Sequence, residues 1–154
     1  MLLIIIDDAH LMETDTLRKI RLLLEDFPRN FNLLLVGQPS LLSNLSLSIH
    51  QDIKSRVTYS CMMRKLNPDD MSGFILSEFD KAGLAHNTFT DEALSLVVRS
   101  ADGVLRKARN LCLSCLLEAV RKQTKTIDTD IVNKILMQPH WRVEFDSDSI
   151  LSYK

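Results

Sequence analysis

Two adjacent carboxylates that follow a short apolar run are the residues of this chain best suited to chemistry. Residues 2–6 are an uninterrupted apolar run, and Asp7 and Asp8 come directly after it. Such a run, rich in β-branched side chains, is too short to span a membrane and predicts a strand buried on both faces. Because ligands of open α/β sheets bind at the carboxyl ends of strands, paired acids at this point suit a metal-nucleotide site. The alternative is a strand that simply ends at two solvated acids.

The elements that must position this pair are predicted to be strands alternating with helices. Apolar residues at helical spacing predict a helix over residues 14–26 that ends at Phe27-Pro28. A second buried strand is predicted over residues 33–36, and a third, less apolar and nearer an edge, over residues 57–62. Residues 1–66 are therefore predicted to have the order βαβαβ.

The pattern changes after residue 66, where only helices are predicted. Each of the next helices carries one apolar face and begins or ends at a residue typical of helix termini. The starting residues are Asn67, Thr90 and Asp128, and the stopping residues are Gly83 and Gly103. We expect an all-helical unit over residues 67–138 and a loose polar tail over residues 139–154.

The composition narrows the class of protein. With 154 residues, 45% hydrophobic and 25% charged, the chain predicts a folded, helix-rich domain or a fragment of a larger one. The net charge of −1 gives the whole molecule no strong attraction to nucleic acid, so DNA binding would need a local patch. No run approaches the length of a membrane span, and the opening run lacks the features of a signal peptide, so we expect a cytoplasmic protein.

Three cysteines, an odd number, fit reduced thiols in that compartment. Cys112 and Cys115 have CxxC spacing inside an apolar helical pattern. We expect them to pack in the core, with metal or redox chemistry as the alternative.

Four short segments lie at the ends of these predicted strands and helices. In their order and spacing they resemble the second half of an AAA+ ATPase. They are similar to the ExeA/GspA-type secretion ATPases and the TnsC/TniB transposition helpers. The segments are Asp7-Asp8-Ala9-His10, Val36-Gly37-Gln38-Pro39, Arg56-Val57, and Gly103-Val104-Leu105-Arg106 with Asn110-Leu111. The resemblance implies an α/β fold: a partial parallel three-layer core of three strands with flanking helices, followed by a small helical lid. The core is residues 1–66 and the lid is residues 67–138.

The resemblance makes the acid pair a Walker B element. Asp7 would lie near Mg²⁺, usually through a water, because this cation keeps part of its hydration shell. Asp8 takes the place of the catalytic carboxylate, which these families usually fill with Glu. Asp is one methylene shorter, and a misplacement of about 1 Å can slow a reaction on the order of 100-fold. His10, just beyond the pair, is expected to be structural.

Two further positions resemble residues that act on the phosphates. Gln38, after the second strand, resembles sensor 1, and its structural alternative is a side chain that only satisfies the turn before Pro39. Arg56 resembles the arginine finger that one subunit offers to the nucleotide of its neighbour. Its alternative is an ordinary solvated arginine, and Lys54 is a nearby competitor for the role.

Arg106 resembles sensor 2, at the start of a helix whose dipole favours phosphate. The chain has Leu105 where these families commonly have proline. Which of Arg106, Lys107 and Arg109 faces the nucleotide therefore stays open, and a solvated basic face is the alternative for all three.

The phosphate-binding loop of this family is missing from the sequence. There is no GxxxxGK[ST], and the four glycines are too dispersed to form one. In the AAA+ sheet, the strand that leads into this loop lies between the strands predicted here at residues 33–36 and 57–62. Without it, two hydrophobic strand edges should be left unpaired. We therefore expect a fragment, a truncated reading frame or one piece of a split protein, which binds ATP and Mg²⁺ only with the missing half and does not hydrolyse ATP alone.

The resemblance favours a fragment of an ATPase that assembles on DNA as a transposition helper. Its expected partners are other copies in a ring or filament, DNA and a transposase. Residues 99–125 hold seven Lys or Arg against two acids, a bias that suits phosphate or DNA but equally a solvated helix face. The alternatives are the cytoplasmic ATPase part of an ExeA-like secretion protein, and a non-catalytic module that docks on a partner ATPase.

Overall fold

The chain folds as two compact units in a computed structural model that describes residues 2–25 and 31–141. The first unit is Met1–Met63 and the second is Arg64–Lys154. Each is described by itself. No helix among the described residues is long and apolar enough to span a membrane.

The first unit is built on a two-stranded parallel sheet. Strand β1 (Leu2–Ile6) pairs with β2 (Phe31–Leu35), with Leu2 opposite Phe31 and Ile6 opposite Leu35. Helix α1 (Thr14–Glu25) lies in the connection between them, as parallel neighbours require a crossover. Its predicted end, at Phe27-Pro28, lies outside the described residues.

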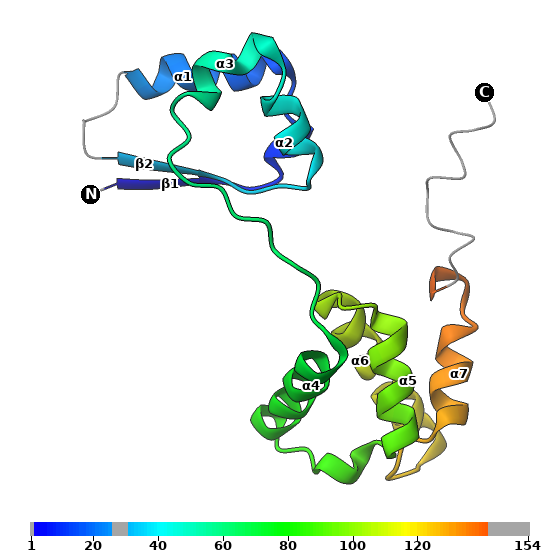
Figure 1. The fold of residues 1–154 in the computed structure, drawn as a ribbon. Coiled ribbons are helices and arrows are strands. Elements are labelled where there is room, and N and C mark those ends of the chain that lie inside the picture. The colour runs from blue at the N-terminus through cyan, green and yellow to red at the C-terminus, as the bar shows by residue number, and fades with distance from the viewer. Residues whose placement is uncertain (1, 26–30, 142–154) are drawn as a thin grey trace, which may run out of the picture. The chain divides into compact units, whose positions relative to one another are not determined.

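One face of this sheet is covered by helices. Helix α1 is joined there by α2 and α3, and all three lie on the same side of the two strands (Figure 1). The half-buried side chains of Ile4, Ile6 and Leu33 belong to the strand positions that alternate with the exposed ones. The shorter elements of this unit are η1 (Ala9–Leu11), α2 (Ser40–Leu45), η2 (Ser48–His50) and α3 (Gln51–Lys54).

Two predictions about this sheet are wrong. Residues 57–62 form no strand; they follow α3 as exposed chain, with Tyr59 82% and Met62 65% accessible. The first strand is not buried on both faces either, because Leu3 and Ile5 remain 52% and 59% exposed. Both errors have one cause: a strand and a buried face each need a neighbouring segment, and the described chain supplies none there.

His50 is a buried imidazole without a partner. It is fully buried, and neither ring nitrogen has a hydrogen-bond partner among the described residues. Leaving buried polar atoms unpaired is unfavourable, so His50→Leu should raise the free energy of unfolding of the first unit by about 1–2 kcal/mol. Thermal unfolding followed by circular dichroism measures this. His86→Leu, at an exposed histidine, is the control and should change stability by less than about 0.5 kcal/mol. A loss of stability in His50→Leu would contradict the prediction.

The second unit is all-helical, and its predicted helix ends are confirmed except at Gly103, which lies one residue beyond the Asp102 that caps the end of α5. The side chains of Asn67, Thr90 and Asp128 each accept a hydrogen bond from the backbone N–H three residues on, and Gly83 ends a helix with φ of 69°. The helices are α4 (Pro68–Ala82), η3 (His86–Thr88), α5 (Asp91–Ala101), α6 (Leu105–Lys122), α7 (Thr129–Leu136) and η4 (Pro139–Trp141). Residues 142–154 of the predicted tail lie outside the described residues.

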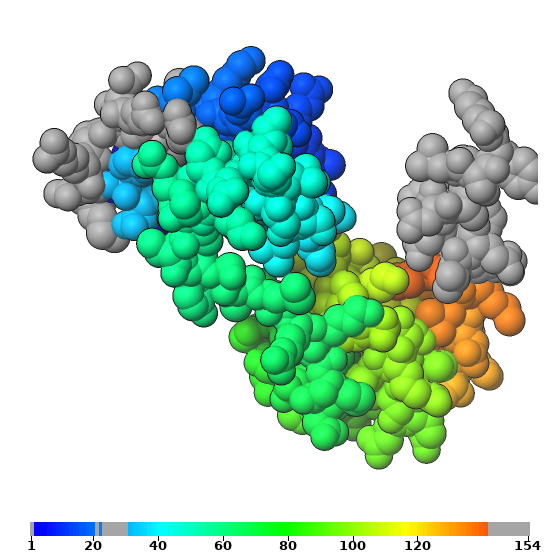
Figure 2. All heavy atoms as spheres, turned by 45° about the horizontal axis from the view of Figure 1, so that its top comes forward, coloured from blue at the N-terminus to red at the C-terminus, as the bar shows by residue number. Residues whose placement is uncertain are grey.

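These helices share one apolar core and form one continuous mass in the space-filling view (Figure 2). Phe79 of α4 stacks on Phe89 with ring centroids 5.3 Å apart. Cys112 and Cys115 are buried in this core, and burial raises the pKa of each thiol to about 12. At neutral pH these thiols are therefore protonated, which favours the predicted packing role.

Glu118 of α6 is a nearly buried carboxylate that anchors α7. The Lys134 ammonium donates to Glu118 Oε1 at 2.6 Å, and Arg121 Nε lies 3.3 Å from Oε2. The hydrogen bond from Lys134 is the main cause that lowers the pKa of Glu118 below its ordinary value of 4.5.

Because folding favours the charged form of Glu118, its contribution to stability should be complete above pH 4.5 and be lost as the pH falls through the lowered pKa. Glu118→Gln should therefore flatten the acid side of the stability–pH curve of this unit. Unfolding midpoints measured between pH 7 and 3 test this against Glu92→Gln, at an exposed acid. An unchanged slope in Glu118→Gln would contradict it.

Candidate functional site

The acid pair lies where β1 ends, in a turn with an unusual backbone. Asp7 follows the strand directly, and its Oδ1 accepts a hydrogen bond from the backbone N–H of Asp8 at 2.8 Å. Asp8 adopts the left-handed conformation, with φ of 52° and ψ of 30°, and leads into the 3-10 turn Ala9–Leu11. Asp is among the few residues that tolerate this conformation. Both carboxylates are exposed, so the turn presents two negative charges to solvent.

The ends of the two strands are joined by backbone hydrogen bonds. Val36 N–H donates to Ile6 O, and Ala9 N–H donates to Val36 O, both at 2.9 Å. The turn with Asp7 and Asp8 is therefore next to the turn with Gln38, at the carboxyl ends of the two strands.

Gly37 makes this close approach possible. A Cβ at Gly37 would lie 3.1 Å from the backbone N of His10 and 3.3 Å from its Nδ1. The His10 side chain is nearly buried, and its Nδ1 lies 3.9 Å from Asp8 Oδ1, too far for a hydrogen bond. His10 thus packs beneath the acid turn, in keeping with its expected structural role.

Gln38 follows β2, and its side chain is exposed. Its backbone carbonyl accepts from Leu41 N–H at 2.9 Å, which starts α2. Its amide is exposed and has no hydrogen bond to another described residue. Among the described residues the turn is therefore held by backbone groups, and the role of Gln38 as sensor 1 stays a prediction.

Lys54 is the last residue of α3, and Arg56 follows in the turn after this helix. Arg56 N–H donates to Ile53 O at 2.9 Å in the turn after α3, and its guanidinium is exposed. Among the described residues, it makes no ion pair or hydrogen bond with Asp7 or Asp8.

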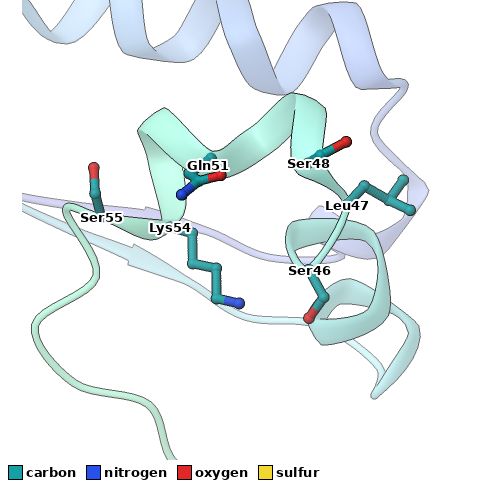
Figure 3. A pocket seen from close by; sticks show the side chains of 6 residues that line it. All are labelled: Ser46, Leu47, Ser48, Gln51, Lys54 and Ser55. Atoms are coloured by element: carbon teal, nitrogen blue, oxygen red, sulfur yellow. The ribbon is translucent and has the colours of Figure 1, made fainter.

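Lys54 points across a shallow hollow toward Ser46 (Figure 3). This hollow has a volume of about 320 Å³. It is lined by Ser46, Leu47, Ser48, Gln51, Lys54 and Ser55. Asp7, Asp8, Gln38 and Arg56 do not line it, and all four are exposed.

Arg106 belongs to the second unit, in the first turn of α6. That helix begins at Leu105, and the preceding Gly103 has φ of 72°. The side chains of Arg106, Lys107 and Arg109 are all exposed. The choice among these three cations stays open, and the convergence of Arg106 with the acid pair stays a prediction because the two residues belong to different units.

The start of α6 is tied to the segment before α4. Leu66 N–H donates to Gly103 O at 3.1 Å, and the Lys65 ammonium pairs with the Asp102 carboxylate. The hydrogen bond from Lys65 is the main cause that lowers the pKa of Asp102, and the charge of Lys107 adds a smaller effect. The sequence analysis did not predict this tie or the left-handed backbone of Asp8. The positive φ of Asp102 and Gly103 could have been predicted, because an Asp-Gly pair at a helix end signals it.

The residues present fit a magnesium ion held mainly by water and phosphate. In the described parts of the chain, no group of three or more His, Cys, Asp or Glu side chains could hold a metal. Within residues 2–25 and 31–141, Asp7 Oδ1 accepts the bond from the backbone and Oδ2 has no hydrogen-bond partner. One carboxylate oxygen is compatible with Mg²⁺, which commonly takes one or two protein carboxylates and completes its shell with water and phosphate.

Comparison with known proteins supplies sequence relatives at low identity. No family model matches the chain. It is 25% identical over 132 residues to General secretion pathway protein A of Aeromonas hydrophila, covering 83% of this chain and 24% of that protein. It is 27% identical over 106 residues to the uncharacterized HTH-type transcriptional regulator MJ0774 of Methanocaldococcus jannaschii, covering 66% of this chain and 26% of that protein. The chain thus spans about a quarter of these curated relatives.

Solved structures match over most of the chain. The Holliday junction branch migration motor RuvB of Thermotoga maritima aligns with a TM-score of 0.65 and 20% identity, over 87% of this chain and 43% of that one. The ADP form of Aeropyrum pernix ORC2 aligns with a TM-score of 0.68 and 18% identity, over 89% of this chain and 39% of that one. The chain therefore has an AAA+ ATPase-like fold of mixed α/β class, with a small parallel sheet and mostly helices.

Proposed function

We propose that this chain is the C-terminal part of an AAA+ ATPase that assembles on DNA as a transposition helper. The observation that carries the nucleotide site is the acid turn of Asp7 and Asp8, hydrogen-bonded to the end of β2 beside Gln38. The AAA+-like fold supports it, as does the ADP-bound state of one similar structure. The chain contains no phosphate-binding loop, so it does not hydrolyse ATP alone.

Each site residue then has a role in phosphoryl transfer. When bound, Mg²⁺ neutralises charge that develops on the phosphates, and Asp7 helps to hold it. Asp8 orients the attacking water, and Gln38 contacts the γ-phosphate or that water. Arg56 supplies positive charge to the nucleotide of a neighbouring copy, and Arg106 binds the phosphates from the head of α6.

The DNA-directed role is supported by two features. The exposed basic residues of α6 bias this helix toward phosphate. One similar structure is named a Holliday junction motor, and one relative is named a transcriptional regulator. A transposase gene beside this one would support the proposal.

A second candidate function is the ATPase part of a secretion protein. It is favoured by the match to General secretion pathway protein A, which covers 83% of this chain. A membrane segment encoded downstream would support this alternative over the transposition role.

Calorimetry with magnesium-ATP tests the nucleotide site. We compare the 154-residue chain with a version extended at its N-terminus by a strand, a GxxxxGK[ST] loop and a helix. Only the extended chain should bind, and Arg106→Ala should weaken that binding at least about tenfold, because charged hydrogen bonds to phosphate are lost. Arg99→Ala, an exposed arginine of α5, is the matched control. Tight binding by the 154-residue chain alone, or no effect of Arg106→Ala, would contradict the proposed site.

A further inference from the structure

The imidazole of His10 lies between the two turns of the candidate site. On one side, its Nδ1 is 3.9 Å from Oδ1 of Asp8. On the other side, a Cβ at Gly37 would lie 3.3 Å from the same nitrogen, so the ring is next to the backbone that precedes Gln38. Backbone hydrogen bonds of 2.9 Å join the two turns and fix this arrangement. The ring is therefore placed to link the acid turn to the turn of Gln38.

The Nδ1 atom of His10 is buried and has no hydrogen-bond partner among the described residues. The side chain as a whole is only 9% exposed. Leaving a buried polar atom unpaired is unfavourable, and an apolar side chain would serve packing alone without this cost. A buried, unpaired nitrogen that faces a carboxylate therefore indicates a hydrogen bond that forms in another state of the site.

The carboxylate of Asp8 is not held in place by the described residues. It is 72% exposed and accepts no hydrogen bond from any of them. The left-handed backbone, with φ of 52°, sets the direction of the Cα–Cβ bond but allows the carboxylate to rotate. A catalytic carboxylate must be held within about 0.5 Å of its working position. No lysine or arginine of the described residues pairs with Asp8, so His10 is the basic group within reach.

We propose that His10 is a positioning residue that holds Asp8 for the attack of water on ATP. Rotation of the exposed carboxylate shortens the distance of 3.9 Å by about 1 Å, so that His10 Nδ1–H donates to Asp8 Oδ1. The other carboxylate oxygen, Oδ2, then faces the water. A neutral imidazole adds no charge, so the carboxylate keeps the negative charge that orients or activates this water. This inference rests on the proposed function, which gives Asp8 its role.

The proposal determines which ring nitrogen of His10 carries the proton. A lone pair on Nδ1 would face the negative Oδ1 of Asp8 and be repelled, so the proton belongs on Nδ1. Nitrogen-15 NMR of the 154-residue chain, at a pH where the ring is neutral, should therefore show Nδ1–H. Asp8→Ala should increase the share of the Nε2–H form, whereas Asp15→Ala, at an exposed acid of α1, should not. An Nε2–H ring in the unsubstituted chain would overturn the inference.

Hydrolysis by the N-terminally extended protein tests the role of His10 in the reaction. His10→Phe keeps the bulk of the ring but removes the donor, so kcat should fall at least about tenfold while KM for magnesium-ATP changes less than about twofold. His10→Asn places its amide N–H near the position of Nδ1 and should keep kcat within about threefold of the unsubstituted protein. A packing role predicts the opposite order, because Phe fills the space and Asn leaves a cavity. That order would overturn the inference.

A double-mutant cycle shows whether His10 acts through Asp8. In the Asp8→Asn protein, His10→Phe should lower kcat by less than about twofold, because the carboxylate that His10 positions is already gone. His86→Phe, at an exposed histidine of the second unit, is the matched control and should leave kcat unchanged in either background. Losses that multiply, with a fall of about tenfold from His10→Phe in both backgrounds, would overturn the inference.

The two proposals fail separately. An extended protein that binds no magnesium-ATP would contradict the proposed function, and the position of the proton on His10 in the 154-residue chain would still decide the contact with Asp8. An extended protein that hydrolyses ATP equally well with and without His10→Phe would contradict the positioning role and leave the proposed function in place.

Discussion

Gly103→Ala should destabilise the helical unit by about 3 kcal/mol. Gly103 has φ of 72°, a conformation that is unfavourable for a residue with a Cβ by about 1–2 kcal/mol. That Cβ would also lie 2.6 Å from Leu66 O and 2.7 Å from Lys65 Cβ, a clash with backbone that only a shift of the chain relieves. Because the unit holds the chain's only tryptophan, Trp141, denaturant unfolding followed by its fluorescence measures the effect.

Two other glycines provide a graded control. Gly83→Ala shares the positive φ of 69° but has open space around the new methyl group, so it should cost only about 1 kcal/mol. Gly73→Ala lies inside α4 with nothing within 4 Å, so it should stabilise the unit by about 0.5–1 kcal/mol. Equal effects at Gly103 and Gly83 would show that the contact with Leu66 is not a close one in solution.

Asp8→Asn should lower ATP hydrolysis by the extended protein at least about 100-fold while leaving magnesium-ATP binding nearly unchanged. The amide keeps the size and the left-handed preference of Asp8 but removes the charge that orients or activates water. Steady-state phosphate release and calorimetry separate the two effects. Asp15→Asn, at an exposed acid in the first turn of α1, is the control and should hydrolyse normally.

Asp8→Glu addresses the departure from the usual carboxylate of these families. The longer side chain should reach the water better, but Glu tolerates the left-handed backbone less well than Asp. Geometry alone would allow a gain in the hydrolysis rate on the order of 100-fold. We therefore expect a gain smaller than this. A hydrolysis rate that is unchanged in Asp8→Asn would remove Asp8 from the mechanism.

The helical unit was predictable because its signals are local. Asn67, Thr90 and Asp128 cap helices through bonds to residues three positions along the chain, and the apolar spacing of each helix defines its inner face. The same holds for Gly83, whose positive φ depends on its own residue type.

The sheet was only partly predictable because pairing is not local. Residues 57–62 have the composition of a strand, yet a strand exists only beside another, and the sequence of the segment does not say whether that partner is present. The burial of Leu3 and Ile5 fails for the same reason.

For the candidate site, the sequence placed Asp7, Asp8 and Gln38 at strand ends, and the structure makes these ends neighbours. The contact of Gly37 with His10 could not be foreseen, since it depends on how two turns approach in space.

The bond between Leu66 N–H and Gly103 O has a structural consequence. The chain enters the helical unit through residues 64–66. This bond and the Lys65–Asp102 pair hold that segment against the residues that precede α6. Residues 65 and 66 are therefore held to the residues just before the helix that bears Arg106, so the entry of the chain and the start of α6 form one connected turn of this unit.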